Sequence, residues 1–204
     1  MTSQIADRPS RRALFWGTGI ALAAGAAAVV LFVLPAETSI DPTAVGKSSG
    51  LSSMANPRAD EALKRGQQHP NVFTASTSHQ TAEPGLKDHF TYELAPYEEI
   101  ELKYVLDQGA PITFSWKADG PLNYDLHAQP FDGGEALTES YAVKRADQQA
   151  GRYVAAFAGI HGWHWHNRTL STVHLKLDTS GRMKGSKLFG PHGEQDRPLS
   201  PPAS

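Results

Sequence analysis

The chain has 204 residues, a formal net charge of -2 at pH 7 and no cysteine. A chain of this length holds one domain, or one domain with extensions, and the lack of cysteine excludes disulfides, thiolate zinc sites and cysteine nucleophiles. The sequence has neither a basic patch nor interleaved aromatic and basic residues, so a nucleic acid is not expected as a partner.

An uncharged apolar run lies near the amino terminus, from Ala13 to Leu34. A helix of that length covers the hydrocarbon core of a bilayer, which is about 30 Å thick. The nearest charged residues are basic before the run and acidic after it: Arg8, Arg11, Arg12, Glu37 and Asp41. Because positive flanks stay in the cytoplasm, we expect residues 1–12 to be cytoplasmic and 13–34 to cross the inner (plasma) membrane once. The rest of the chain would then be extracytoplasmic, in the periplasm if the cell is Gram-negative.

A second interpretation of this region is an export signal. The segment Ser10–Phe15 resembles a twin-arginine signal, which a receptor reads and which is not itself an anchor. A cleavable signal also needs a short apolar core and a small-x-small site, whereas this run is long and Leu34-Pro35-Ala36 matches such a site poorly. We therefore favour an uncleaved anchor, and whether the twin-arginine-like segment directs export stays open.

Residues 35–87 are rich in Ser, Thr, Ala, Pro and Gly and have little apolar periodicity. Such a composition buries too little apolar surface to offset the loss of chain entropy on folding. We expect a mostly disordered spacer that tethers the following domain, with a short helix over residues 57–67, where apolar residues precede a glycine.

From residue 88 the pattern changes to short stretches in which apolar and polar residues alternate. These stretches are separated by turn signals rich in glycine and proline, and they run over residues 90–94, 99–106, 112–116, 122–127, 153–157, 158–166 and 172–177. Seven to eight short strands at this spacing predict an all-β fold, an antiparallel β-sandwich over residues 88–180. No such alternation follows Leu188, so residues 181–204 are interpreted as a carboxy-terminal tail.

The segment Ala158–Thr169 predicts a two-sided strand. Alternation sends Trp163 and Trp165 to one face, and His164 and His166 to the other. We expect the two indoles to pack in the core of the sandwich together with Phe114 and Trp116, since buried aromatic side chains contribute the largest apolar areas. The imidazoles would then lie on the outer face.

Several segments are similar to the bacterial proteins called transmembrane anchor proteins. The similar segments are Ile40–Gly46, Glu99–Gly109, Ile112–Gly120, Tyr124–His127 and Phe157–Arg168. The order of elements more distantly resembles GOLD-type and pre-peptidase carboxy-terminal sandwiches, in which a Gly-x-Tyr/Trp-x-Phe/Trp strand ends near an asparagine. The resemblance implies an anchored β-sandwich, and it implies no activity. His164 and His166 lie outside the shared pattern, so a histidine-based function would be particular to this chain.

Three histidines form a candidate metal site. If Trp165 pairs with Val173, His164 lies opposite His174, and a register shift of two residues puts His166 there instead. Either register brings His164, His166 and His174 onto one outer face, where opposed Cβ atoms are about 5 Å apart.

Three neutral imidazoles suit Cu(II), Zn(II) or Ni(II) and leave a position for water or a fourth ligand, such as Asp125 or His127. A cofactor would then be Cu or Zn. The alternative is a solvated polar face whose histidines bind nothing. His161, between two glycines, is expected to be a buried histidine that hydrogen-bonds to a loop carbonyl.

Motifs of the common enzyme classes are missing from the sequence, including Gly-x-Ser-x-Gly, His-Glu-x-x-His and a glycine-rich phosphate loop. We therefore do not expect an enzyme. The combination of a membrane anchor, a flexible tether and a small β domain favours a non-catalytic module that binds a protein partner in the cell envelope. The alternative function is a periplasmic protein that binds or delivers metal through the three histidines.

Overall fold

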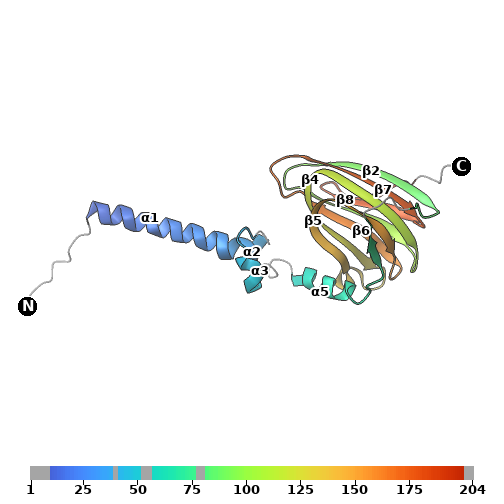
Figure 1. The fold of residues 1–204 in the computed structure, drawn as a ribbon, viewed down its shortest axis with the longest axis horizontal. Coiled ribbons are helices and arrows are strands. Elements are labelled where there is room, and N and C mark those ends of the chain that lie inside the picture. The colour runs from blue at the N-terminus through green and yellow to red at the C-terminus, as the bar shows by residue number, and fades with distance from the viewer. Residues whose placement is uncertain (1–9, 39–40, 52–56, 77–80, 200–204) are drawn as a thin grey trace, which may run out of the picture. The chain divides into compact units, whose positions relative to one another are not determined.

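The computed structural model describes residues 10–38, 41–51, 57–76 and 81–199 (Figure 1). Its chain forms two compact units, Met1–Asp60 and Glu61–Ser204. The first is helical, and more than half of the second lies in antiparallel strands.

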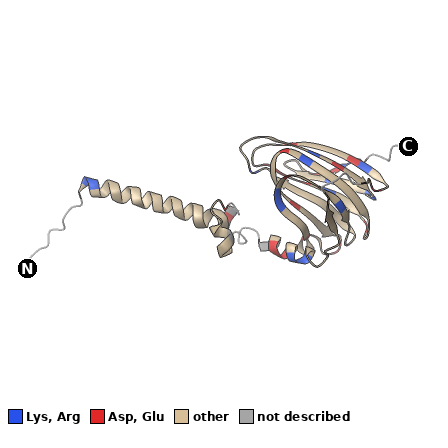
Figure 2. Ribbon diagram, in the orientation of Figure 1, with Lys and Arg blue, Asp and Glu red and all other residues tan. Residues whose placement is uncertain are grey.

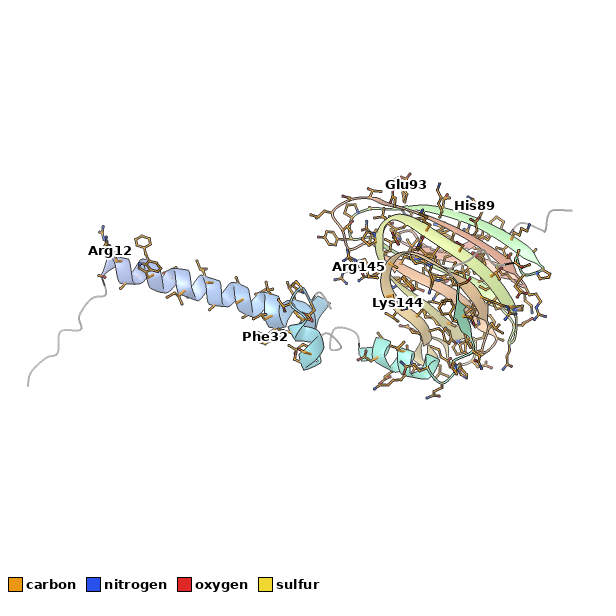
Figure 3. All side chains as sticks on the ribbon, viewed as in Figure 1. Arg12, Phe32, His89, Glu93, Lys144 and Arg145 are labelled. Atoms are coloured by element: carbon orange, nitrogen blue, oxygen red, sulfur yellow. The ribbon has the colours of Figure 1, made fainter. Side chains whose placement is uncertain are left out.

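The helical unit contains one long apolar segment. It begins with helix α1 (Arg11–Ala28), capped by the hydroxyl of Ser10, and continues through one π-helical turn, η1 (Val29–Val33), into α2 (Leu34–Thr38). The stretch Arg11–Glu37 is long and apolar enough to cross a membrane, and an 18-residue window within it has a mean hydropathy of 2.3. Figure 2 shows its basic start and uncharged length, and Arg12 and Phe32 are labelled in Figure 3. A short helix, α3 (Val45–Ser49), follows.

The predicted short helix is confirmed as α5 (Pro57–Gly66). It is amphipathic, and its carboxy-terminal part packs on the strand unit: Arg65 Nε donates to the carbonyl oxygen of Thr138 at 2.8 Å. Just after it, His69 Nδ1 lies 2.8 Å from a carboxylate oxygen of Glu139. The interpretation of residues 35–87 as a mostly disordered spacer is therefore wrong for residues 61–76 and 81–87, which belong to the folded domain.

The all-β prediction is confirmed, and the described residues form nine strands in place of seven to eight. The strands are β1 (Phe73–Ala75), β2 (Leu86–Leu94), β3 (Glu99–Leu106), β4 (Pro111–Pro130), β5 (Glu139–Val154), β6 (Gly159–His166), β7 (Val173–Gly181), β8 (Gly185–Gly190) and β9 (Gly193–Arg197). A short 3-10 helix, η2 (Gly134–Leu137), lies between β4 and β5. All strand pairings are antiparallel.

Two long strands join the layers of the sandwich. The first part of β4, residues 112–118, pairs with β7, whereas residues 123–130 pair with β6, and β5 accompanies β4 through both parts. Between the parts the register shifts where Gly120 and Pro121 interrupt the ladder. One layer therefore contains β2 and β7, and the other contains β9, β8, β3 and β6 (Figure 1).

The core between the layers is aromatic, as predicted. Phe114, Trp116, Trp163 and Trp165 are each at most 4 % exposed. Their rings contact across the layers, with centroids 4.5 Å apart for Phe114 and Trp163 and 6.0 Å apart for Trp116 and Trp165. Edge-to-face pairs at these distances stabilise a core beyond the area they bury.

The last two strands contradict the interpretation of residues 181–204 as a tail. Arg197 on β9 reaches Asp88 on β2, with Nη1 2.8 Å and Nη2 3.2 Å from its carboxylate oxygens. Tyr104 donates to the same carboxylate, and the Arg197 guanidinium lies 4.7 Å from the ring centroid of Phe90. This bidentate ion pair, mostly shielded from water, connects the open edges of the layers. The sequence did not reveal it because these polar strands lack an apolar face.

Gly162 on β6 is required by close backbone packing. A Cβ atom there would lie 2.0 Å from the carbonyl oxygen of Leu102 on β3. We expect Gly162→Ala to lower the free energy of unfolding by about 3 kcal/mol, as overpacking of a rigid core does. Urea denaturation followed by tryptophan fluorescence measures this, with Gly185→Ala as the control, since its Cβ would meet only Val105 at an ordinary 3.7 Å. Equal stability of the two variants would contradict the explanation.

Candidate functional site

The outer face of the β3–β6–β4 layer carries a group of titratable side chains that could act as acids, bases or ligands. β6 lies between β3 and β4, so residues line up in rows of three across the strands. One row is Glu101, His164 and Asp125, and the next is Lys103, Gly162 and His127. The alternation that turns the indoles inward therefore turns all of these side chains outward.

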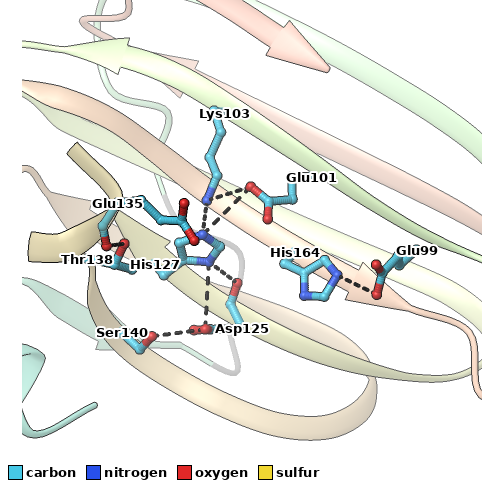
Figure 4. A network of polar contacts seen from close by, with 9 residues as sticks. All are labelled: Glu99, Glu101, Lys103, Asp125, His127, Glu135, Thr138, Ser140 and His164. Atoms are coloured by element: carbon cyan, nitrogen blue, oxygen red, sulfur yellow. Dashed lines mark hydrogen bonds and ion pairs between the residues drawn. The ribbon is translucent and has the colours of Figure 1, made fainter. Parts of the chain in front are cut away.

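Lys103 and His127 meet directly over Gly162, which has no side chain to separate them (Figure 4). Lys103 is 0 % exposed and His127 is 6 % exposed, so this contact is shielded from water. Lys103 Nζ hydrogen-bonds to His127 Nε2 and lies 3.5 Å from Glu101 Oε2. His127 Nδ1 lies 3.3 Å from the carbonyl oxygen of Asp125 and 3.7 Å from its Oδ2. We call Glu101, Lys103, Asp125, His127 and Ser140 the buried polar cluster.

Burial shifts the proton affinities within this cluster. It lowers the pKa of Lys103 to about 8, although the carboxylates of Glu101 and Asp125 act in the opposite direction. Burial, together with the nearby Lys103 ammonium, holds the pKa of His127 well below its usual value. His127 is therefore neutral, and its Nε2 accepts a hydrogen bond from the Lys103 ammonium while Nδ1 carries the proton.

Asp125, in the same cluster, also has a shifted pKa. Burial raises its pKa to about 6, opposed by the hydrogen bond that Ser140 Oγ donates to Oδ2 at 2.9 Å. Its other oxygen, Oδ1, is buried without a hydrogen-bond partner in the part of the chain that the structure describes. Perturbed acids and bases of this kind cluster at functional sites, although structural ion pairs also produce them.

An open groove of about 590 Å³ adjoins the cluster. Its lining comes from the start of β3, from β6, from the end of β4 with η2, and from the β8–β9 turn: Glu98, Glu99, Ile100, Glu101, Gln129, Glu135, His164, Phe189, Gly190 and Pro191. Four of these described residues are glutamates and none is lysine or arginine. Glu101 belongs to both the groove and the buried polar cluster, and it is the link between them.

The groove rim is held rigidly at the β2–β3 loop. Glu98 accepts hydrogen bonds from the Tyr92 hydroxyl at 2.8 Å and from the Ala95 amide at 2.7 Å. Burial and this carboxylate raise the pKa of Tyr92 to about 12. Asn167, which is fully buried after β6, donates to the carbonyl oxygens of Leu94, Ala95 and Ser171. Asn167 therefore ties the β2–β3 and β6–β7 loops together beside the groove.

The predicted metal site is not formed by the described residues. Trp165 pairs with Ile100 and Tyr124, not with Val173, so the proposed register is wrong. His174 lies on β7 in the other layer, where its Nδ1 is 2.7 Å from a carboxylate oxygen of Asp119. The sequence could not show that β4, rather than β7, lies beside β6.

His164 and His166 do share the outer face. Glu99 Oε2 lies 3.3 Å from His164 Nε2 and 3.6 Å from His166 Nδ1. Among the described residues, however, no group of three or more histidine, aspartate or glutamate side chains could hold a metal ion. The basis for Cu or Zn as a cofactor is therefore lost with His174.

His161 is fully buried, as expected. Its Nδ1 lies 2.7 Å from the Tyr153 hydroxyl. Burial lowers its pKa to about 3, against the effect of a hydrogen bond with the backbone of Phe157 in the preceding loop. It is a core histidine and does not reach the groove lining.

Sequence reasoning named Asp125 and His127 only as possible fourth ligands, and it missed Lys103 and Ser140. One sequence signal was available. Gly162 interrupts the bulky residues of the tryptophan strand, and a glycine there leaves space above the sheet. Which side chains fill that space depends on strand order, which the sequence does not give.

No known protein family model matches the chain, and no curated protein has a significantly similar sequence. The fold and the site thus define a class only: a sandwich-like all-β domain with an acidic groove, in a chain with one apolar helix near its amino terminus.

The buried lysine gives the domain a distinctive pH dependence. The pKa of Lys103 is about 8 in the folded chain and 10.5 ordinarily, so the folded state binds fewer protons between these values. The free energy of unfolding therefore increases with pH in this interval, by about 1 to 2 kcal/mol from pH 8 to about 9.5. Urea denaturation of the full-length chain in mild detergent measures it.

Lys103→Met is the control for this prediction, because methionine has a similar length and no proton to lose. The variant should lack the increase. The interval ends below pH 10 because burial raises the pKa of Tyr104 and Tyr153, and these groups destabilise the fold at higher pH. A wild-type curve parallel to the variant's would show that Lys103 is not desolvated.

Proposed function

We propose that this protein is a single-pass membrane protein that displays its β-sandwich on the extracytoplasmic side of the inner (plasma) membrane. The domain binds a protein partner of the cell envelope and carries out no catalysis. In a Gram-negative cell the domain lies in the periplasm. The resemblance to bacterial transmembrane anchor proteins supports the same arrangement.

The groove is the observation that supports partner binding. Its volume lies within the range of specific ligand sites, and it combines an apolar side with a few fixed polar groups. Its rim is rigid because Glu98 is held by two hydrogen bonds, so little conformational entropy is lost when a partner binds.

The same site argues against catalysis. A general acid or base must come within hydrogen-bond reach of the substrate. Lys103 and His127 are the two bases of the buried polar cluster, and their pKa values are lowered. Their side chains are directed at each other and shielded from solvent. Neither residue belongs to the groove lining, so a ligand in the groove contacts the cluster through Glu101 alone. The cluster is thus better suited to organising the sheet face than to proton transfer.

The orientation of the helix supports the location. Arg11 and Arg12 begin the apolar segment and Glu37 lies at its end. Three arginines precede the apolar run (Arg8, Arg11 and Arg12), whereas Lys47 is the nearest basic residue after it, and this excess favours a cytoplasmic amino terminus. Large side chains such as Phe15 and Trp16 are more than 70 % exposed along α1, a surface that lipid would cover.

Membrane topology can be tested directly because the natural chain has no cysteine. A single cysteine at Lys176, an exposed position on β7, should react with a membrane-impermeant maleimide in intact spheroplasts. A cysteine at Ser3 should react only after lysis. The opposite labelling pattern would place the domain in the cytoplasm and end the proposal.

Partner binding can be tested by photo-crosslinking in intact membranes. A benzoylphenylalanine at Phe189 replaces one groove aromatic with another, and it should give a defined adduct of constant mass. The same amino acid at Lys176, on the other layer, should give none. Background labelling that is equal at both positions would mean that the groove has no partner.

A further inference from the structure

The chemistry of the groove selects its ligand, given the partner-binding function proposed above. Glu98, Glu99 and Glu101 around the start of β3 and Glu135 in η2 line one space. Four carboxylates face this space, and the described lining residues include no lysine or arginine. A cation in the groove would reduce the mutual repulsion of these carboxylates.

The lining also has an apolar part. Phe189 and Pro191, at the end of β8 and in the β8–β9 turn, line the same space as the carboxylates. A flat cation stacks on an aromatic ring, and the methylene stem of a long basic side chain packs against apolar surface. A bare metal ion would use neither contact, and the described residues contain no set of ligands able to hold one.

One of the lining carboxylates already contacts an organic cation within the fold. Glu101 Oε2 lies 3.5 Å from the ammonium of Lys103 on the buried side. The Glu101 side chain remains 33 % exposed, so it also faces the groove. The protein's own lysine therefore occupies one side of a carboxylate whose other side is available.

We propose that the groove binds a basic side chain, an arginine or lysine carried by an extended peptide segment of the partner, between the carboxylates of Glu99, Glu101 and Glu135 and the ring of Phe189. The groove is open to solvent, and η2 and the β8–β9 turn both contribute to its lining, so the peptide would lie along these two elements. Glu101 then contacts the bound cation and Lys103 at the same time, which couples ligand binding to the buried polar cluster.

The test uses the full-length chain in mild detergent and a capped peptide, acetyl-Ala-Arg-Ala-Arg-Ala-amide, with calorimetry as the readout. The matched control peptide has citrulline in place of arginine, which keeps the shape and removes the charge. We expect saturable binding of the arginine peptide and none of the citrulline peptide. Ca²⁺, Zn²⁺ and spermidine are titrated separately. Binding of any of these without binding of the arginine peptide would overturn the proposed ligand class.

Two variants locate the site. The double variant Glu99→Gln and Glu135→Gln should weaken peptide binding at least tenfold, because it removes two of the carboxylates and preserves their shape. Glu93→Gln, an exposed glutamate on β2 in the other layer, should leave binding unchanged. Equal weakening by both would mean that the peptide binds the overall charge of the domain and not the groove. The urea denaturation curve of each variant confirms that it is folded.

A second readout tests the coupling through Glu101. The charged and titratable groups around Lys103 are Glu101 on its own strand, Asp125 and His127 on β4, Glu135 in η2 and Lys187, which pairs with Lys103 from β8, whereas His164 on β6 is turned toward Glu99. Because the pKa of Lys103 is about 8, raising the pH from 7 to 9 removes its charge and leaves Glu101 free for the ligand. Arginine keeps its charge throughout this range. Peptide affinity should rise severalfold, and in Lys103→Met it should not change with pH.

The outcomes separate this inference from the proposed function. If the crosslinker at Phe189 traps a partner but the arginine peptide does not bind, the assigned ligand is wrong and the interaction module stands. If neither result is obtained, both are wrong. If the pH dependence persists in Lys103→Met, Lys103 does not compete for Glu101.

Discussion

The pairing of β6 between β3 and β4 constrains everything on the outer face of this domain. Trp163 and Trp165 fill the core on one side of β6, and their indoles stack with ring centroids 5.7 Å apart. A register shift by one residue would move both indoles into water and is therefore strongly disfavoured. With the register fixed in this way, Gly162 lies between Lys103 and His127, and Glu101 lies beside His164.

The buried polar cluster is a costly arrangement that is only partly compensated. A desolvated ammonium is unfavourable unless carboxylates and hydrogen-bond acceptors surround it. Here His127 supplies the acceptor and Glu101 supplies the nearest opposite charge. The lowered pKa of Lys103 shows that desolvation still outweighs these contacts. Such a site is sensitive to any charge brought to Glu101 from outside, and this physical property connects the cluster with the groove.

The carboxy-terminal strands complete the groove as well as the sandwich. Phe189 and Pro191 form its apolar side, and they are held in place because β8 pairs with β3 and β9 with β8. The ion pair between Arg197 and Asp88 fixes β9 to the opposite layer. A region that lacks apolar alternation therefore contributes both to stability and to the candidate binding site.

The sequence alone determined the properties that depend on local pattern. The uncharged run before Pro35 predicted a long apolar helix, and two-residue alternation predicted antiparallel strands with Phe114, Trp116, Trp163 and Trp165 in the core. It also placed His164 and His166 on the outer face, because the direction of a side chain in a strand follows from its position in the alternation.

Only the tertiary structure decided which strands are neighbours. Strand order depends on contacts between residues far apart in the chain, and the alternation in β4 and in β7 is equally compatible with a place beside β6. The structure puts β4 there, so His127 and Asp125 join Lys103 while His174 pairs with Asp119 in the other layer. Polar strands such as β9 have no apolar face to reveal them, and it is long-range pairing and one buried ion pair that hold them in the fold.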